Sequence, residues 1–240
     1  MTSIKRSVIV VGGGIIGCSI AWRLAQTGVA VTVIDAGEIG GESSWAGAGM
    51  LAPGGEIKED TTWARRCVES LKMYAGFVDE LQRESGVPVD YRQCGALEEW
   101  PRLVKRARAQ AALGIASEEG EGFLYFPDDS IVNSRDMIAA LKVLLARLGA
   151  RLIPYTAVDA IEDGAVVLHG GGKMTADWIV NAAGAWASGL MRDHDAPKSH
   201  PVKGHLIGYF LDPGTFPQIQ RRGHIYVMQR SSGFTIAGST

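Results

Sequence analysis

VIVVGGGIIGCSIAW, the stretch from Val8 to Trp22, can be interpreted in two opposed ways, and the choice between them decides the fold. It is either the first turn of a nucleotide-binding fold or the apolar core of an export signal, with Cys18 as the lipid acceptor. Lys5 and Arg6 favour the second interpretation, since a basic start precedes the apolar run of a signal. The order of the elements around the glycines is needed to choose between them.

Three glycines in this stretch follow a β-branched run and precede a helical pattern. Gly12, Gly14 and Gly17 have the G-x-G-x-x-G spacing. A second buried strand is expected over residues 29–34, and it ends at Asp35. An export signal does not require strand, glycine turn, helix, strand and acid in that order. The sequence therefore favours nucleotide binding over export.

The residue types in this unit suit a dinucleotide. Gly12 permits a tight turn, Gly14 lets the backbone approach a pyrophosphate, and Gly17 lets the helix pack against the strand. The positive end of the helix dipole then faces the phosphates. Asp35 can accept hydrogen bonds from the ribose hydroxyls, and Ala36 follows it where an NADP site favours arginine. NADP is disfavoured, whereas NAD and FAD both remain open.

The composition limits the class of protein. The chain has 240 residues, of which 46% are hydrophobic and 21% charged, with 31 glycines, as expected for a globular α/β protein. A net charge of −2 gives no electrostatic reason to expect nucleic acid or an anionic membrane as partner. The three cysteines form no CxxC motif, so neither a disulfide framework nor a metal site is predicted. We expect a cytoplasmic protein without a membrane span.

A run of small residues, GGESSWAGAGMLAPGG, occupies residues 40–55. It is either a flexible loop or a backbone that lies flat against a ring system, and its Trp and Met-Leu residues favour the second. Beyond it, Asp60 or Thr61 begins a long helix. The apolar stripe of that helix is expected in the core and comprises Trp63, Cys67, Leu71, Tyr74, Phe77 and Leu81.

The second half of the chain contains another strong helical pattern. Asn133 or Ser134 begins it, and its inner face is expected to hold Met137, Leu141, Leu144, Leu145 and Leu148. Between the two long helices, residues 103–113 read as a short basic helix and residues 118–122 as an exposed loop.

Taken in order, these landmarks resemble the D-amino-acid-oxidase-like FAD-dependent oxidoreductases, and within them the glycine oxidase (ThiO) type of thiamine biosynthesis. The matching stretches are VIVVGGGIIGCSIAWRLA, VTVIDAG, GGESSWAGAGMLAP, YFPDDSIVNSRDMIAAL, IVNAAGAWAS, PVKGH and HIYVMQRSSGFTIAGST. The resemblance implies FAD rather than NAD. It also implies a doubly wound, Rossmann-like α/β FAD-binding domain (1–80 and 130–205) interleaved with a smaller antiparallel α+β substrate domain (81–129 and 206–240).

The same resemblance implies a set of site residues. The cofactor would be bound by Gly12, Gly14, Ile15, Ile16 and Gly17 at the diphosphate, Asp35 and Ala36 at the ribose, Ser43, Ser44, Ala48, Gly49 and Met50 along the diphosphate and flavin, Val158 near the adenine, and Ala183 and Gly184 beside the cofactor. Tyr226 resembles the substrate-side tyrosine, although a packing aromatic is an equal alternative. Arg230 is a weaker candidate because an arginine before a hairpin turn is usually solvated, and His224 is more often a packing residue.

The implied activity is oxidation of a small amine or amino acid to an imine, which hydrolyses to an oxo-acid and ammonia while oxygen becomes peroxide. Chains of this family continue past the point that corresponds to Thr240, so we expect this one to be truncated at its C-terminus. A non-catalytic FAD-binding chain is therefore the alternative, and a sheet that lacks its last strand predicts a homo-oligomer or a partner chain. An NAD-dependent dehydrogenase has no further support in the sequence.

Overall fold

A computed structural model describes residues 6–57, 59–99, 107, 110–191 and 198–238. The chain divides into two compact units of comparable size. The first comprises residues 1–47, 83–87 and 134–202, and the second comprises residues 48–82, 88–133 and 203–240. The domain bounds expected from the sequence differ from this grouping over residues 48–80, 83–87, 130–133 and 203–205. Neither unit is markedly the smaller.

The first unit contains a parallel sheet, a small antiparallel sheet and four helices. Its elements are β1 (Ser7–Val11), α1 (Ile15–Gln26), β2 (Ala30–Ile34), α2 (Ser43–Ala46), α6 (Ser134–Arg147), β9 (Arg151–Ile153), β10 (Val158–Glu162), β11 (Ala165–Leu168), β12 (Lys173–Thr175), β13 (Trp178–Asn181), the 3-10 turn η1 (Gly184–Trp186) and α7 (Ala187–Leu190).

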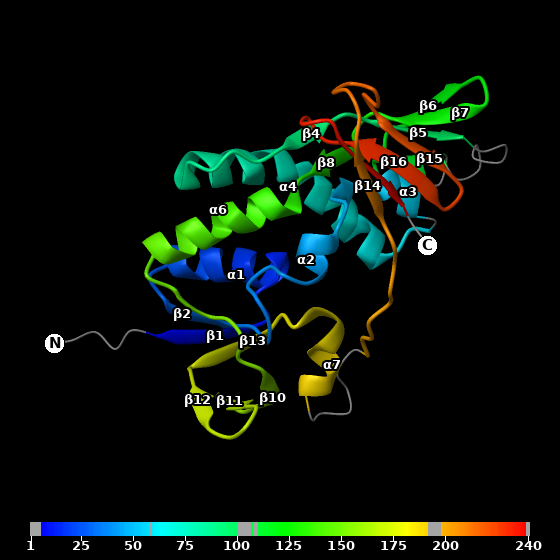
Figure 1. Cartoon of the computed structure of the whole chain (residues 1–240). Coiled ribbons are helices and arrows are strands. Elements are labelled where there is room, and N and C mark those ends of the chain that lie inside the picture. The colour runs from blue at the N-terminus through cyan, green and yellow to red at the C-terminus, as the bar shows by residue number, and fades with distance from the viewer. Residues whose placement is uncertain (1–5, 58, 100–106, 108–109, 192–197, 239–240) are drawn as a thin grey trace. The chain divides into compact units, whose positions relative to one another are not determined.

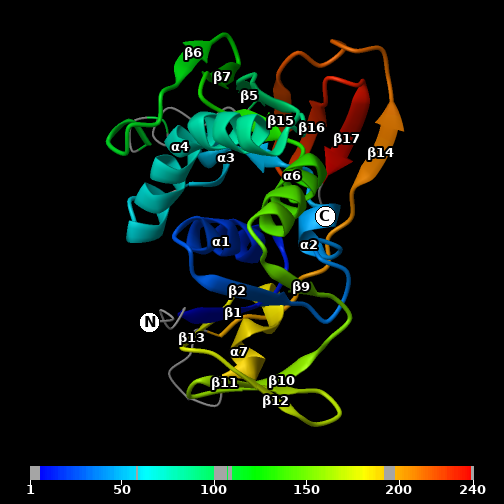
Figure 2. The same ribbon diagram turned by 90° about the vertical axis from the view of Figure 1, so that its left-hand side faces the viewer.

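The parallel sheet lies between a helical layer and a second sheet. Its strand order is β13-β1-β2-β9, with α1 and α6 on one face and β10, β11 and β12 on the other (Figures 1 and 2). Ile9 and Val11 of β1 pack in one cluster with Val166 of β11. Because both faces are covered, the strands read as continuous Val/Ile runs. The doubly wound expectation is corrected here, since an antiparallel sheet takes the place of helices on the second face.

The second unit is built on a seven-stranded sheet. Its elements are β3 (Met50–Leu51), α3 (Pro53–Glu56), α4 (Thr62–Ser85, which ends in the first unit), β4 (Tyr91–Gln93), β5 (Ala96–Glu99), β6 (Glu118–Gly120), β7 (Phe123–Phe126), β8 (Ser130–Val132), β14 (Ile207–Phe210), β15 (Ile219–Arg222), β16 (Ile225–Gln229) and β17 (Phe234–Gly238).

The large sheet is mixed rather than antiparallel throughout. Its order is β14-β17-β16-β15-β5-β7-β6, and β15 runs parallel to β5. The expected loop over residues 118–122 is corrected in part, because Glu118–Gly120 pairs with β7 as an exposed edge strand. A smaller sheet, β3-β8-β4, lies in the same unit. The predicted basic helix over residues 103–113 falls mostly outside the described residues.

The long helices begin where the sequence predicted, but two of the residues predicted on their inner faces, Trp63 and Leu148, are exposed. The Thr61 hydroxyl accepts a hydrogen bond from the N–H of Ala64 at 3.1 Å and so caps α4. Leu81 of the predicted stripe is buried, whereas Trp63 is 77% exposed. Helix α6 buries its predicted inner residues except Leu148, which follows the helix end and is 43% exposed. An amphipathic pattern gives the apolar face but not what covers each of its positions.

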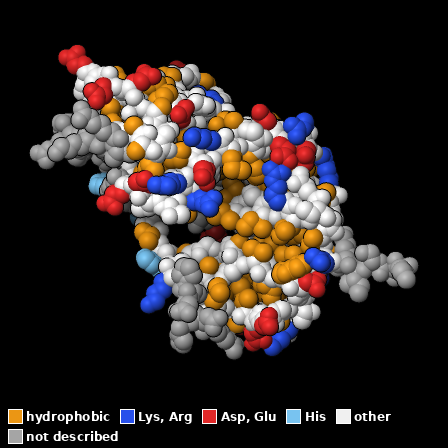
Figure 3. All heavy atoms as spheres, turned by 180° about the vertical axis from the view of Figure 1, so that it is seen from behind, with side chains coloured by type: hydrophobic (Ala, Val, Ile, Leu, Met, Phe, Trp, Pro, Cys, Tyr) orange, Lys and Arg blue, Asp and Glu red, His pale blue; other side chains and the backbone are white. Residues whose placement is uncertain are grey.

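Some large hydrophobic side chains remain at the surface. Hydrophobic patches lie between charged groups on the face shown in Figure 3. All four residues of edge strand β14 are exposed, including Ile207 and Phe210. The predicted association with another chain stays a prediction. Within the described ranges, no helix combines the length and the apolar character needed to cross a bilayer.

The core of the second unit contains a buried ion cluster. Arg221 Nη1 donates to Asp129 Oδ2 at 2.8 Å, and Arg221 Nη2 lies 3.4 Å from Glu98 Oε2. All three residues are at most 7% exposed. Burial raises the pKa of Asp129 to about 6, and Arg221 opposes that shift. The folded chain therefore favours a protonated Asp129 at a pH where an unfolded chain would have lost the proton.

Asp129 should make the folded chain less stable as the pH rises. The unfolded carboxyl loses its proton near its ordinary pKa of 3.8, whereas the folded one holds it to about 6. We expect the free energy of unfolding to fall between about pH 4 and 6 by an amount on the order of 2–3 kcal/mol from this group. Urea unfolding across that pH range should show the fall in the free energy of unfolding in the wild type. The fall should be mostly absent in Asp129→Asn. Asp128→Asn, at the exposed neighbouring position, is the control. An undiminished fall in Asp129→Asn would contradict this assignment.

The helical layer should depend on Leu141. This side chain is fully buried in α6, so Leu141→Ala should lower the free energy of unfolding by about 2–5 kcal/mol. Leu148→Ala removes the same atoms at an exposed position and should cost less than about 1 kcal/mol. Urea denaturation of the two variants measures both values. Equal costs would show that α6 does not bury the face described here.

Candidate functional site

The turn after β1 is confined between two neighbouring strands. The Gly12 N–H donates to the Ile34 carbonyl at 2.8 Å, and the Ala182 N–H donates to the Val11 carbonyl at 2.7 Å. Gly12 has a φ of +102°, and an added Cβ would lie 2.3 Å from the Ala182 oxygen. Only glycine satisfies both the backbone conformation and this spacing.

The other two glycines of the motif differ in what surrounds them. A Cβ on Gly17 would lie 1.9 Å from the Gly12 oxygen, so close packing of α1 on the turn requires glycine there. A Cβ on Gly14 would meet only the Ser44 hydroxyl, at 3.2 Å. Gly12 and Gly17 are therefore required by the fold. At Gly14 no backbone is in the way, and the Ser44 hydroxyl bounds the space beside it.

The amino end of α1 offers hydrogen-bond donors to that space. The Ile15 N–H donates to Ser44 Oγ at 2.9 Å, which leaves the hydroxyl proton of Ser44 able to point to an anion. Ser134 Oγ fixes the same segment by donating to the Ser44 carbonyl at 2.6 Å. In the described part of the chain, the N–H groups of Ile16 and Gly17 have no hydrogen-bond acceptor. These donors and the helix dipole together suit a diphosphate.

Asp35 is held at the end of β2 by two backbone amides. Its Oδ2 accepts from the Gly13 N–H at 2.6 Å, and its Oδ1 accepts from the Gly37 N–H at 2.8 Å. The residue is half-exposed, and Ala36 beside it is exposed. Each carboxylate oxygen keeps a lone pair for a further donor, such as a ribose hydroxyl. This end of β2 fits the sugar of an adenosine dinucleotide.

The remaining predicted residues of the first unit lie in different surroundings. Ala183 adjoins the glycine turn, since its nitrogen would be 2.8 Å from a Cβ on Gly12, and Gly184 begins the following 3-10 turn. Ser43 is exposed in α2. Val158 lies in β10, where it packs partly buried against the cluster that contains Val166. The glycine turn, the first turn of α1 and Asp35 therefore form a cradle that suits the diphosphate and ribose of an adenine dinucleotide.

The second unit holds the rest of the predicted cofactor residues. Ala48 is buried, and Gly49 follows with a φ of +90° and a carbonyl that accepts from the Val132 N–H at 2.8 Å. A Cβ on Gly49 would lie 1.8 Å from the Val132 oxygen, so this position also requires glycine. Met50 then pairs with Ile131 in the small sheet. The run of small residues is thus ordered here rather than a flexible loop.

Arg230 is buried, so the solvated alternative weighed against it in the sequence analysis does not hold. It is 7% exposed, although it precedes the hairpin turn between β16 and β17. Its guanidinium donates to Asn133 Oδ1 and to the Ala48 carbonyl, the latter at 3.3 Å. These contacts fix the segment that leads into Gly49. The sequence could not show this, because both acceptors lie far from Arg230 along the chain.

Tyr226 lies on β16, and an acid missed in the sequence analysis, Glu56, acts on it electrostatically. It is half-buried, and Gly238 of the paired strand makes room for it, since a Cβ there would be 3.0 Å from the phenol oxygen. Burial, and then the carboxylate of Glu56, raises the pKa of Tyr226. Glu56 directly follows the run of small residues, which was the available signal. His224 is exposed nearby in the chain.

An open groove of about 840 Å³ begins at Glu56. One wall is the outer side of α4, and the other is the segment around Leu51, Ala52 and Ile57. The α4 residues in this wall include the exposed or partly exposed Trp63, Cys67, Leu71 and Tyr74. The groove is therefore mainly apolar, and Glu56 places a carboxylate on its lining.

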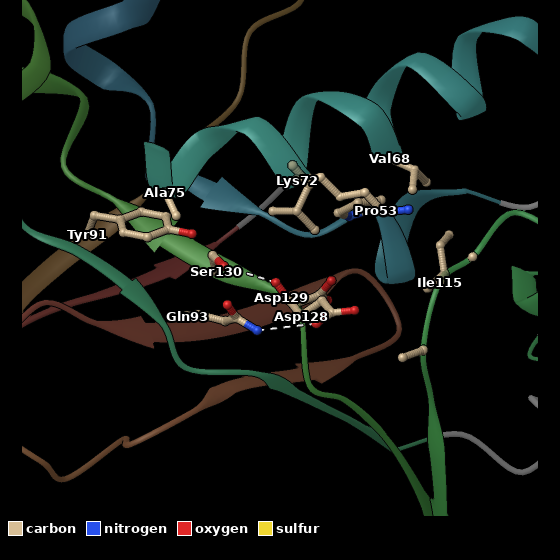
Figure 4. Close-up of a pocket in the computed structure, with 13 residues that line it drawn as sticks. Pro53, Val68, Lys72, Ala75, Tyr91, Gln93, Ile115, Asp128, Asp129 and Ser130 are labelled. Carbon is tan, nitrogen blue, oxygen red and sulfur yellow. Dashed lines mark hydrogen bonds between the residues drawn. The ribbon is translucent and has the colours of Figure 1, made fainter. Parts of the chain in front are cut away.

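A smaller pocket of about 270 Å³ lies under α4 (Figure 4). Its polar residues already hydrogen-bond to one another: Gln93 Nε2 donates to Asp128 Oδ1 at 3.2 Å, and Ser130 Oγ donates to the Asp128 carbonyl at 2.9 Å. Asp129, at the same pocket, is bound to Arg221. These groups serve the local structure, so the larger groove is the better candidate for a ligand.

Comparison with known proteins identifies the family. The model of the DAO family, described as FAD dependent oxidoreductase, matches residues 7–240. A glycine oxidase of Bacillus licheniformis is 30% identical over 98% of this chain and 70% of its own length. The bifunctional protein ThiO/ThiG of Synechocystis sp. is also 30% identical, and the chain spans 38% of that protein.

Solved structures show the same fold. The crystal structure of glycine oxidase from Geobacillus kaustophilus has a TM-score of 0.88 and 24% identity, with 98% of this chain and 72% of that one covered. L-proline dehydrogenase from P. horikoshii has a TM-score of 0.77 at 24% identity, with 98% and 70% covered. The glycine cradle, the fold and the family match agree, and the chain belongs to the DAO family of FAD-dependent oxidoreductases.

Proposed function

We propose that this chain binds FAD in the cradle of its first unit and oxidises a small amino acid or amine, as a protein of glycine oxidase type. The observation that carries the proposal is that the first turn of α1 leaves the N–H groups of Ile16 and Gly17 without an acceptor among the described residues, with Asp35 at the end of the next strand. The similarity to glycine oxidases and ThiO proteins supports an amino-acid substrate with oxygen as acceptor.

Main-chain groups would do most of the cofactor binding. The N–H groups of Ile16 and Gly17 and the hydroxyl of Ser44 would hold the diphosphate. The carboxylate of Asp35 would accept the ribose hydroxyls, and Ala36 leaves no partner for a 2′-phosphate. Bound FAD supplies the chemistry by accepting two electrons from the amine and passing them to oxygen.

The side chains of the second unit would bind and orient the amine. Glu56 presents a carboxylate that attracts an ammonium group, and Tyr226 lies within its electrostatic reach as a hydroxyl donor. Arg230 acts as a positioning residue, since its bond to the Ala48 carbonyl fixes the segment from Ala48 to Met50.

The amine loses two electrons and two protons to give an imine, water hydrolyses the imine to an oxo-acid and ammonia, and oxygen takes up the electrons and protons as hydrogen peroxide.

Retention of FAD tests the cradle. Purified chain incubated with FAD and desalted should keep the visible flavin absorption bands. Gly14→Leu should lose them, because its side chain would occupy the place of the diphosphate and press on the Ser44 hydroxyl, which lies 3.2 Å from an added Cβ. Gly76→Leu, at an open helical position of α4, is the matched control and should retain FAD. Full retention by folded Gly14→Leu would refute the assigned site.

Turnover tests the amine site. Glycine, sarcosine or D-alanine should bleach the flavin bands without oxygen and yield peroxide with oxygen. Glu56→Gln should raise KM for these amines about tenfold or more, because it removes the carboxylate near the ammonium at a cost of roughly 1–2 kcal/mol. Glu118→Gln, an exposed acid outside the groove, controls for a general change of charge. If the chain retains the flavin and no amine reduces it, the chain binds FAD without oxidising amines.

A further inference from the structure

Tyr155 has a backbone conformation that its side chain disfavours. Among the described residues it is the one residue other than glycine with a positive φ, which is +53°. A bulky side chain is rarely found in this left-handed conformation. Two backbone hydrogen bonds hold it there. The Tyr155 N–H donates to the Gly37 carbonyl at 2.9 Å, and the next N–H, of Thr156, donates to the Asp35 carbonyl at 2.8 Å. Glycine would meet this requirement without strain, so the backbone does not explain the tyrosine.

Packing does not explain the tyrosine either. Its side chain is 73% exposed, so the ring adds little to any core. An aromatic ring that is left in water on a disfavoured backbone lowers stability rather than raising it. Residues in such conformations gather at binding sites, where contact with a ligand offsets the strain. The ring of Tyr155 is therefore a candidate for contact with a ligand.

Tyr155 lies at the same edge of the parallel sheet as Asp35. Strands β2 and β9 are neighbours and run in the same direction, so their carboxyl ends meet at one edge (Figure 2). Asp35 directly follows β2, and Tyr155 comes two residues after β9. The Asp35 N–H donates to the Ile153 carbonyl at 3.0 Å, which adds a third hydrogen bond between the two segments. Ligands of open α/β sheets bind at this edge.

The strand order places three features of the site in a row. The glycine turn follows β1, Asp35 follows β2 and Tyr155 follows β9, and these strands are consecutive in the sheet. The adenosine half of a dinucleotide has the matching order of diphosphate, ribose and base. A diphosphate at the glycine turn and a ribose at Asp35 would direct the base toward the end of β9.

We propose that the ring of Tyr155 stacks on the adenine of the bound dinucleotide. This inference rests on the proposed function, because it takes the cradle of the first unit as the FAD site. Adenine is flat and has two π-faces, and aromatic side chains bind bases by stacking on them. The three backbone hydrogen bonds would hold the ring in place before the ligand arrives, so that little side-chain entropy is lost on binding.

Titration calorimetry with ADP and with inorganic pyrophosphate tests the stacking. Tyr155→Leu removes the ring and keeps an apolar side chain. It should weaken ADP binding about tenfold, because base–aromatic stacking is lost. Pyrophosphate has no base, so its affinity should stay unchanged. Tyr155→Phe keeps the ring and should bind ADP as the wild type does. The matched control is Trp178→Leu, at an exposed aromatic residue at the amino end of β13, and it should also leave ADP binding unchanged.

A second variant separates binding from folding. Tyr155→Gly removes the ring and also relieves the left-handed backbone. It should unfold at a urea concentration no lower than that of the wild type, and it should lose ADP affinity as Tyr155→Leu does. A tyrosine that served only the structure would lose stability in both variants.

The outcomes separate this inference from the proposed function. Wild-type ADP affinity in Tyr155→Leu would overturn the stacking and leave the cradle intact. Equal losses of ADP and pyrophosphate affinity, or a markedly lower urea midpoint in Tyr155→Gly, would assign Tyr155 to the structure of the turn and would also overturn the stacking. If the wild type binds neither ADP nor FAD, the proposed function fails and the stacking fails with it. ADP affinity that depends on the ring, in a chain that oxidises no amine, would support the stacking and overturn only the oxidase activity.

Discussion

The close approach of two backbones at Gly12 is the constraint on which the first unit depends. The Ala182 carbonyl oxygen and the Gly12 carbonyl oxygen lie where side chains at Gly12 and Gly17 would be. These contacts place the end of β13 against the turn after β1 and bring α1 close to both. The first turn of α1 then leaves the N–H groups of Ile16 and Gly17 without an acceptor among the described residues, and Asp35 ends the next strand. Packing alone thus creates a place where main-chain donors and one carboxylate point outward, which is what an adenosine diphosphate requires.

Much of this arrangement could be predicted because it is local in sequence. The turn, the helix and Asp35 lie within one strand-helix-strand unit, so spacing and residue type determine their geometry. The start of α6 and the cap of α4 at Thr61 followed from similar local rules. The family resemblance supplied what local rules could not, namely FAD rather than NAD, and the match of the DAO family model to residues 7–240 agrees with it.

The features that escaped prediction depend on contacts between distant segments. Nothing near Arg230 in the sequence indicates that Asn133 and Ala48 accept its hydrogen bonds. Glu56 was not singled out from the sequence, and its electrostatic effect on the pKa of Tyr226 appears only in the structure. The second face of the parallel sheet was expected to carry helices, and the strands β10 to β12 cover it because their apolar residues pack on Ile9 and Val11. Helical periodicity identified the stripe that includes Trp63, but it could not show whether that stripe is buried in a core or lines a groove.

The central claim is that main-chain amides of α1 bind a diphosphate, and amide NMR tests it most directly. The ¹H–¹⁵N signals of Ile16 and Gly17 should shift downfield and saturate as ADP is added to the labelled chain, because their N–H groups would donate to phosphate oxygens. Adenosine, which lacks the diphosphate, should leave these two signals in place while it shifts those of Gly13 and Gly37 beside Asp35. Unshifted Ile16 and Gly17 signals at saturating ADP, or equal shifts with adenosine, would contradict the account.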